Sequence, residues 1–526
     1  MWMSRQVLIA ALICGALTAS AQPDSFDKAL IEARSTLVAK YGQGELPRID
    51  RGLRQVRKMW RPGDGGPALL LEFVTTEFLP GGALLDETFR RLEFVLERTD
   101  GYLNSLSRDV RRNLDLELGP VLPIDHRLGE FDPSSHVEED LFKSKVAFVA
   151  LLNFRGTTLD ERSQEGARWS RREWAEGRLA GRFTSRSSPE DGQKLLRAYT
   201  AASTYIATYN IFSYHILTRD GKRLFPAGQR LLSHWHLRDE IKACYGTVNG
   251  YEKQRLLAKV MDAIVQQSIP RAVINNPRLD WTPETGQVQA SSVRDVNPPE
   301  KATGSPAKDR EPDTRYQKWL DVFRAEKAFD RQDAFYPTIF SRRYEQEREL
   351  SEAEITQLLE SVLNARATSP VAKVVKDRLG RKLEDFDIYY SGFAAQPRAD
   401  YAELNQILQR RYPSAKEFGA DLPRILQVFG FSKERARHLA DQVVVEPARG
   451  PGHALGMLRR DDKAHLRTRF EANGMDYKGF NIAIHELGHN IEQIFSTIMI
   501  DHSSLRGVPN VRSEERRVGK ECRSRW

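Results

Sequence analysis

One short segment near the C-terminus constrains the fold of this chain more than any other. His485 and His489 lie four residues apart, with Glu486 between them. Residues four apart stand one turn above each other on a helix, so both imidazoles can reach one metal ion. Apolar residues recur around them at spacings of three and four, at Ile484, Leu487, Ile491, Ile494 and Ile498. The segment is therefore predicted to be an amphipathic helix that buries its apolar stripe and keeps the histidines outside it.

The pattern H-E-x-x-H on a helix is typical of zinc hydrolases. His485 and His489 are the expected Zn²⁺ ligands, and Glu486 is the expected catalytic general base acting on a zinc-activated water. The alternative is coincidence. With 11 His in 526 residues, we expect the pattern by chance in roughly one chain in a hundred. A metal helix is the favoured interpretation.

The N-terminus has the pattern of a secretory signal peptide rather than of a buried helix. Arg5 precedes an apolar run over residues 7–17, and Ala19 and Ala21 flank Ser20 in a small-residue cleavage site. The run is too short to span a membrane, and no later segment reaches the roughly 18 apolar residues that a spanning helix needs. We therefore expect a signal peptide at 1–21, cleavage after Ala21, and export to the periplasm or the medium without a membrane anchor.

The last fifteen residues, 512–526, differ sharply from what precedes them. They hold six Lys or Arg and three Glu, and they show no apolar period. The string resembles a translated sequencing adapter, so we interpret it as non-native, the alternative being an ordinary basic tail. On this interpretation the natural protein continues past Val511 and the chain is a truncation.

The net charge argues against a nucleic-acid-binding protein, and the cysteine content argues against a protein stabilised by disulfides. Leaving out Arg5 and residues 512–526 lowers the net charge from +8 to +4, a weak excess that indicates no nucleic-acid partner. Cys14 lies in the signal peptide and Cys522 in the basic tail, which leaves Cys244 alone. No intramolecular disulfide is then expected, and stability must come from a large core.

A change in composition divides the chain. Between residues 282 and 314, five prolines lie among Ser, Gly, Thr and charged residues, which is typical of a linker or a long surface loop. We expect an N-terminal helical domain at 22–281 and a catalytic domain at 315–511. Helical patterns dominate both, so the predicted fold class is mainly α. Strand patterns at 442–446 and, as an edge strand, at 465–470 add a small β element beside the metal helix.

Zinc peptidases commonly hold an extended peptide along a strand edge. The candidates for contacts with a peptide or its terminal carboxylate are His453, His465, Arg467 and Arg469. A packing or surface role is the simpler explanation for each of them.

The third zinc ligand separates the peptidase classes. A metzincin needs Gly and His three and six residues after the second metal histidine, where this chain has Glu492 and Phe495. The remaining large class uses a His₂Glu site, with a glutamate roughly 25 residues further on. Residues 479–489 and 505–510 resemble gluzincins of the thimet oligopeptidase and oligoendopeptidase family, more than relatives of angiotensin-converting enzyme. The resemblance covers about the last 70 residues and implies a multi-helical zincin-like fold.

The resemblance also implies a glutamate ligand on a helix after the loop. Glu514 and Glu515 stand 25 and 26 residues past His489, but within the segment interpreted as non-native, so the chain is expected to lack this ligand. The expected function is an exported zinc metallopeptidase acting on peptide substrates. The alternative is a secreted, non-catalytic helical binding protein with a vestigial metal motif. The sequence indicates no oligomeric state.

Overall fold

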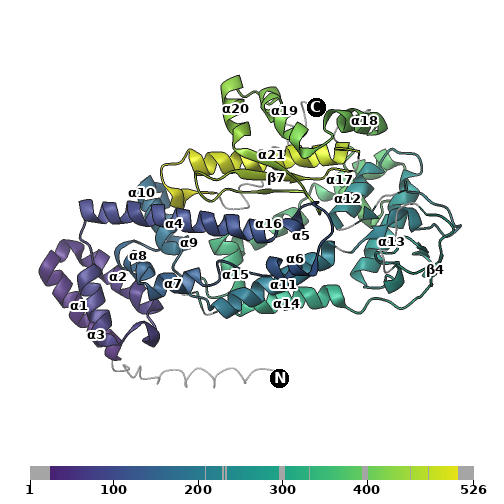
Figure 1. Ribbon diagram of the computed structural model, residues 1–526. Helices are drawn as coiled ribbons and strands as arrows, with labels where there is room; N and C mark the ends of the chain where they lie inside the picture. Colours follow the sequence, from purple (N-terminus) through teal and green to yellow (C-terminus); the bar gives the residue numbers. More distant parts are fainter. Residues whose placement is uncertain are drawn as a thin grey trace, which may run out of the picture.

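The computed structural model describes residues 24–207, 209–227, 230–231, 234–294, 302–330, 332–333, 335–393, 401–450, 452–471 and 473–507. The expected signal peptide and the basic tail lie outside these ranges. Across the described residues the fold is mainly helical, as predicted, with three small sheets. Figure 1 shows the chain coloured along its sequence. Three clusters of buried apolar side chains organise the fold, each built largely from one stretch of the sequence.

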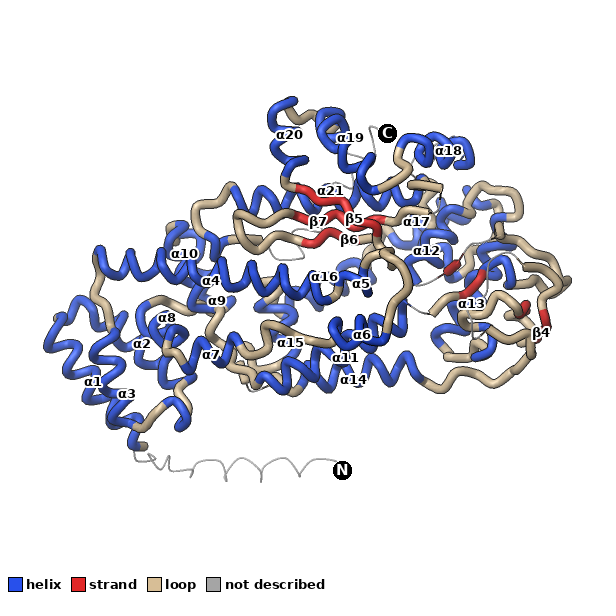
Figure 2. The backbone as a smooth tube through the Cα atoms, in the orientation of Figure 1, coloured by secondary structure: helices blue, strands red, loops and turns tan. Residues whose placement is uncertain are grey.

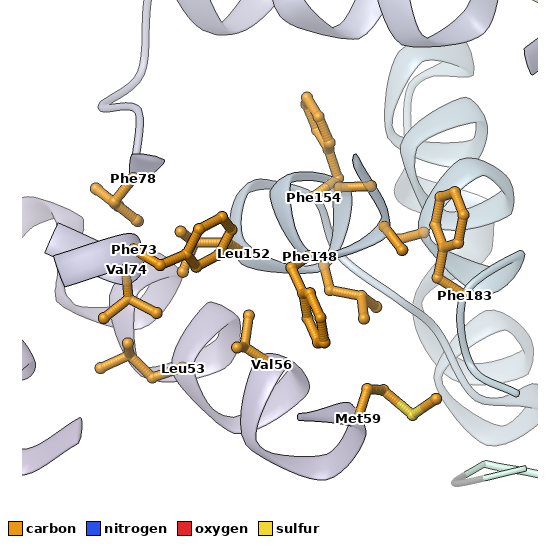
Figure 3. Close-up of a cluster of buried hydrophobic side chains, with 14 of the residues drawn as sticks. Leu53, Val56, Met59, Phe73, Val74, Phe78, Phe148, Leu152, Phe154 and Phe183 are labelled. Atoms are coloured by element: carbon orange, nitrogen blue, oxygen red, sulfur yellow. The ribbon is translucent and has the colours of Figure 1, made fainter. Parts of the chain in front are cut away.

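The first cluster lies among the N-terminal helices. These are α1 (Ser25–Tyr41), α2 (Leu46–Met59), α3 (Pro67–Glu77), α4 (Ala83–Val110), α5 (Arg112–Asp115), α6 (Pro123–Gly129), α7 (Val137–Lys143), α8 (Val146–Asn153), α9 (Leu159–Glu165) and α10 (Arg171–Gly181). All of them except α5, α6 and α9 contribute side chains to the cluster. Leu53, Val56 and Met59 recur every third residue of α2 and are buried, which is the spacing of one helix face. Figure 3 shows Val56 beneath Phe148 of α8. Trp60 stacks at a tilt on Phe148, with ring centroids 4.7 Å apart.

The second cluster is formed mainly by residues 209–288. The elements from here to the metal-helix region are α11 (Pro189–Ala207), β1 (Ile211–Phe212), β2 (Arg230–Leu231), α12 (His234–Ala243), α13 (Gly250–Val265), β3 (Leu279–Thr282), β4 (Gln287–Ala290), α14 (Thr314–Lys327), α15 (Ile339–Ser341), α16 (Glu352–Leu363) and α17 (Thr368–Leu379). Trp281 of β3 pairs with Val288 of β4 in an antiparallel hairpin, and both are buried in the cluster. β4 and the buried Glu311 belong to the proline-rich segment 282–314, so described parts of that segment are packed. The domain boundaries stay a prediction.

The third cluster surrounds the predicted metal helix. Its elements are α18 (Tyr401–Arg411), α19 (Ala415–Val428), α20 (Lys433–Asp441), β5 (Val443–Pro447), β6 (His453–Leu455), β7 (Ala464–Thr468) and α21 (Tyr477–Ile498). The strand order is β5-β7-β6, with β5 parallel and β6 antiparallel to β7. Figure 2 shows these three strands beside α21. The predicted small β element next to the metal helix is therefore present.

The prediction of an edge strand at 465–470 is wrong, because β7 is the central strand. Ala464 and Leu466 are fully buried in the third cluster, whereas Arg467 is buried in ion pairs elsewhere. In the sequence, Arg467 alternates with apolar residues and therefore looks like a side chain that faces solvent. In the fold, other parts of the chain cover the face of the sheet on which Arg467 lies.

Helix α4 supports the metal-helix region from below, as Figure 1 shows. Arg108 of α4 forms an ion pair with the buried Asp462, before β7. Glu93 of α4 lies 2.9 Å from His502 Nδ1 and accepts a hydrogen bond from the Ser504 backbone N–H at 3.1 Å. The chain that follows α21 is thus fixed to a helix from the N-terminal half of the sequence.

Candidate metal centre

The predicted metal helix is α21, and its position is set at its N-terminus. Asp476 caps the helix by accepting a hydrogen bond from the Gly479 N–H at 2.6 Å. Thr468 Oγ1 at the end of β7 donates to the Gly479 carbonyl at 2.7 Å. A Cβ atom on Gly479 would lie 2.5 Å from the Arg469 carbonyl oxygen, so this close approach requires glycine. The start of α21 is therefore fixed against β7.

The apolar stripe of α21 packs into the third cluster, as its periodicity predicts. Leu487 and Ile494 are each 1% exposed, and Ile484, Ile491 and Ile498 pack against the same cluster. His485 lies on the other side of the helix and is exposed. Of the three motif residues, His485 is open to solvent, whereas Glu486 and His489 are half-buried and His489 Nε2 is covered.

His485 and His489 lie together one turn apart. Their ring centroids are 5.2 Å apart and the rings cross at 77°. Two imidazoles at this spacing suit a single zinc ion, which binds histidine nitrogen at about 2.0–2.1 Å. Among the described residues there is no group of three or more His, Cys, Asp or Glu side chains arranged to hold a metal. Glu514 and Glu515 lie outside the described residues.

Glu486 meets the backbone of strand β6. Its Oε2 accepts a hydrogen bond from the Ala454 N–H at 2.8 Å. Ala454 lies opposite Leu466 of β7 in the sheet. Its N–H donates to Glu486 instead of to β7, and therefore points to the outer side of β6. In an extended strand the carbonyl of a residue points the same way as its N–H. The edge of β6 at Ala454 therefore faces the Glu486 carboxylate.

Asn490 is a further residue of the site that the sequence argument missed. Its side chain is fully buried, and its Nδ2 lies 3.5 Å from the Leu455 carbonyl oxygen and 3.4 Å from that of His465. It therefore connects the metal helix to both β6 and β7. The available signal was an amide directly after His489, in a helix whose other inward residues are apolar or small.

The opposite face of the sheet carries a buried ion cluster. Arg467 is 1% exposed; its Nε lies 2.9 Å from Glu446 and its Nη1 lies 2.9 Å from Asp115 of α5. His465 Nδ1 lies 3.2 Å from Glu446 Oε1. Arg467 thus has the packing role that was the simpler expectation, and its buried side chain is not placed to contact a substrate. The cluster joins β5, β7 and α5.

Glu446 makes the stability of this cluster dependent on pH. Burial opposes its ionisation, but hydrogen bonds with His465 and Arg467 outweigh burial and lower the pKa of its carboxyl to about 2. The carboxyl group of an unfolded Glu has a pKa of about 4.3. The stabilisation is therefore fully present above about pH 4.3 and is lost as the pH falls towards 2.

Replacing Glu446 with Gln is expected to lower the free energy of unfolding more at pH 6 than at pH 3. Native Glu446 is ionised at both pH values, but at pH 3 most of the unfolded chain carries a protonated Glu446, so less of the stabilisation remains for the variant to lose. Urea unfolding at both pH values measures the difference, with the exposed Glu471→Gln as the matched control. An equal loss at pH 6 and pH 3 would contradict the role of the charged form.

Comparisons with protein-family models, curated proteins and solved structures found no match to this chain. Among the described residues, no helix combines the length and apolar character needed to cross a membrane. The chemistry of the site is therefore inferred from the contacts described above.

Proposed function

We propose that this protein is an exported zinc-dependent peptidase with a zincin-like catalytic region. The proposal depends on one observation: His485, Glu486 and His489 share a helix whose Glu486 binds the outer edge of strand β6. The resemblance of residues 479–489 to the thimet oligopeptidase and oligoendopeptidase family supports the assignment to peptide substrates. The signal-peptide pattern at 1–21 supports export.

The two histidines would hold the zinc ion, and their donor chemistry suits it. When bound, zinc supplies a Lewis acid that polarises the scissile carbonyl and the attacking water. A third protein ligand is needed to complete the site. In the proposed site, this third ligand comes from outside the described residues.

Glu486 performs the proton transfers. Its carboxylate accepts a proton from the attacking water as the water oxygen bonds to the carbonyl carbon of the peptide. It then gives that proton to the leaving nitrogen as the C–N bond breaks. The Ala454 N–H holds the carboxylate in place before substrate binds.

Strand β6 orients the peptide. The Ala454 N–H already donates to Glu486, but the Ala454 carbonyl lies on the same outer edge of the strand, where the N–H of an extended peptide can pair with it. Because the same edge contacts Glu486, a peptide bound there would lie beside the general base. The hydrogen bond from the Ala454 N–H to Glu486 thus fixes the distance between the outer edge of β6 and the general base.

Zinc binding by the full-length protein, which carries the third ligand, tests the proposal. We expect zinc to bind, and His485→Ala or His489→Ala to weaken its affinity by about 100-fold or more, because each removes a ligand. Isothermal titration with zinc, with zinc content measured by mass spectrometry, gives the result. His438→Ala is the matched control, since His438 is exposed on α20. If the unaltered chain has no higher affinity than the two variants, the non-catalytic binding protein becomes the better assignment.

A further inference from the structure

Helices α16 and α17 expose an apolar surface that the described chain does not cover. No residue of α16 is buried, and Val375 is the only buried residue of α17. The apolar residues of α16 recur at helical spacing, yet Val362 and Leu363 are 70% and 77% exposed. The other exposed apolar residues of the two helices are Leu358, Leu359, Val371 and Val374.

These helices lack the packing that usually stabilises short helices. Isolated helices of about 12–15 residues are marginal in water, and most helices in proteins depend on burial of an apolar face. α16 and α17 have 12 residues each, and neither packs extensively on another described helix or strand. Exposed apolar residues gathered on one face of a helix mark an interaction site.

The charges of the two helices indicate what covers them. α16 carries Glu352, Glu354 and Glu360 and no basic residue. α17 carries Lys373, Lys376 and Arg378 against Asp377. Packing α16 on the α16 of another molecule would oppose like charges, whereas packing α16 on α17 would oppose unlike charges.

We propose that this surface is the interface of a two-fold homodimer, in which α16 of one chain packs on α17 of the other. Two-fold symmetry forms the contact twice, because each chain supplies both helices. The apolar residues provide the buried area, and the opposite charges fix the pairing. The inference is independent of the proposed peptidase activity.

Sedimentation equilibrium of the full chain tests the dimer. We expect a dimer for the unaltered protein, and at least a 100-fold weaker association for Leu359→Glu combined with Val362→Glu. Neither residue belongs to a buried cluster, so the variant should keep its circular dichroism spectrum. The control is Val248→Glu combined with Val265→Glu, which changes two exposed valines elsewhere and should leave the dimer intact.

Charge reversal tests the pairing of the helices. Glu352→Lys with Glu360→Lys on α16, and Lys373→Glu with Lys376→Glu on α17, should each weaken self-association. Mixing the two variants should restore dimers, since every contact then joins opposite charges. A monomer for the unaltered chain at 100 μM or so would overturn the proposal, as would a dimer that neither charge variant weakens; a monomeric result would point to another polypeptide as the cover.

Discussion

In the full-length protein, with its third zinc ligand present, replacing Glu486 with Gln is expected to abolish measurable peptide hydrolysis while leaving zinc content unchanged. The amide has the shape of the carboxylate, and its oxygen can still accept the Ala454 N–H, so α21 keeps its contact with β6. It cannot accept a proton from water. Loss of a general base costs about 10²–10⁴-fold in rate. Initial rates on a fluorogenic peptide mixture, with zinc content measured on the same samples, check both parts.

The control for this experiment is Glu434→Gln on the exposed side of α20, a change of the same chemistry outside the site. It should keep the activity of the unaltered chain. If Glu486→Gln hydrolysed peptides at the unaltered rate, the assignment of the general base would be wrong. If zinc content fell as well, the variant would have disturbed the helix rather than the proton transfer.

Replacing Arg186 with Ala is expected to lower the free energy of unfolding by about 3–5 kcal/mol, because it leaves the buried Asp64 carboxylate and the half-buried Glu139 carboxylate without their cation. Arg186 Nη2 lies 2.8 Å from Asp64 Oδ1 and 2.8 Å from Glu139 Oε1. The Arg186 and Asp64 side chains are 3% and 1% exposed. Burial opposes ionisation of Asp64, but its hydrogen bonds from Arg186 and the Arg61 N–H outweigh this and lower the pKa of its carboxyl. Urea unfolding at pH 7, followed by circular dichroism, measures the loss.

Arg171→Ala is the matched control for the Arg186 variant. Arg171 also pairs with a carboxylate, that of Asp501, but the two side chains are 62% and 50% exposed. Exposed pairs add little because water and salt screen them. We therefore expect no measurable change in stability from Arg171→Ala. Equal effects of the two alanine variants would show that burial of the Arg186 cluster does not matter to stability.

Short-range features of the fold were predictable because their causes lie within a few residues. Serine and aspartate are favoured helix N-caps. The Ser351 hydroxyl accepts the Glu354 N–H at 3.2 Å at the start of α16, and Asp476 caps α21. The edge assignment of β7 failed because Arg467 mimics a surface residue, and only the fold reveals its buried partners.

The sequence by itself determined the helix that carries His485, Glu486 and His489. The four-residue spacing of His485 and His489 places them on one face, and the isoleucine period buries another face, since both follow from helix geometry alone. The tertiary structure decided which groups contact that helix and the strands beside it. Glu486 binds a backbone N–H of Ala454, and backbone groups are the same in every residue, so no sequence pattern marks them. Arg467 pairs with Asp115, 352 residues earlier in the chain, and such a contact exists only once the fold brings the two together.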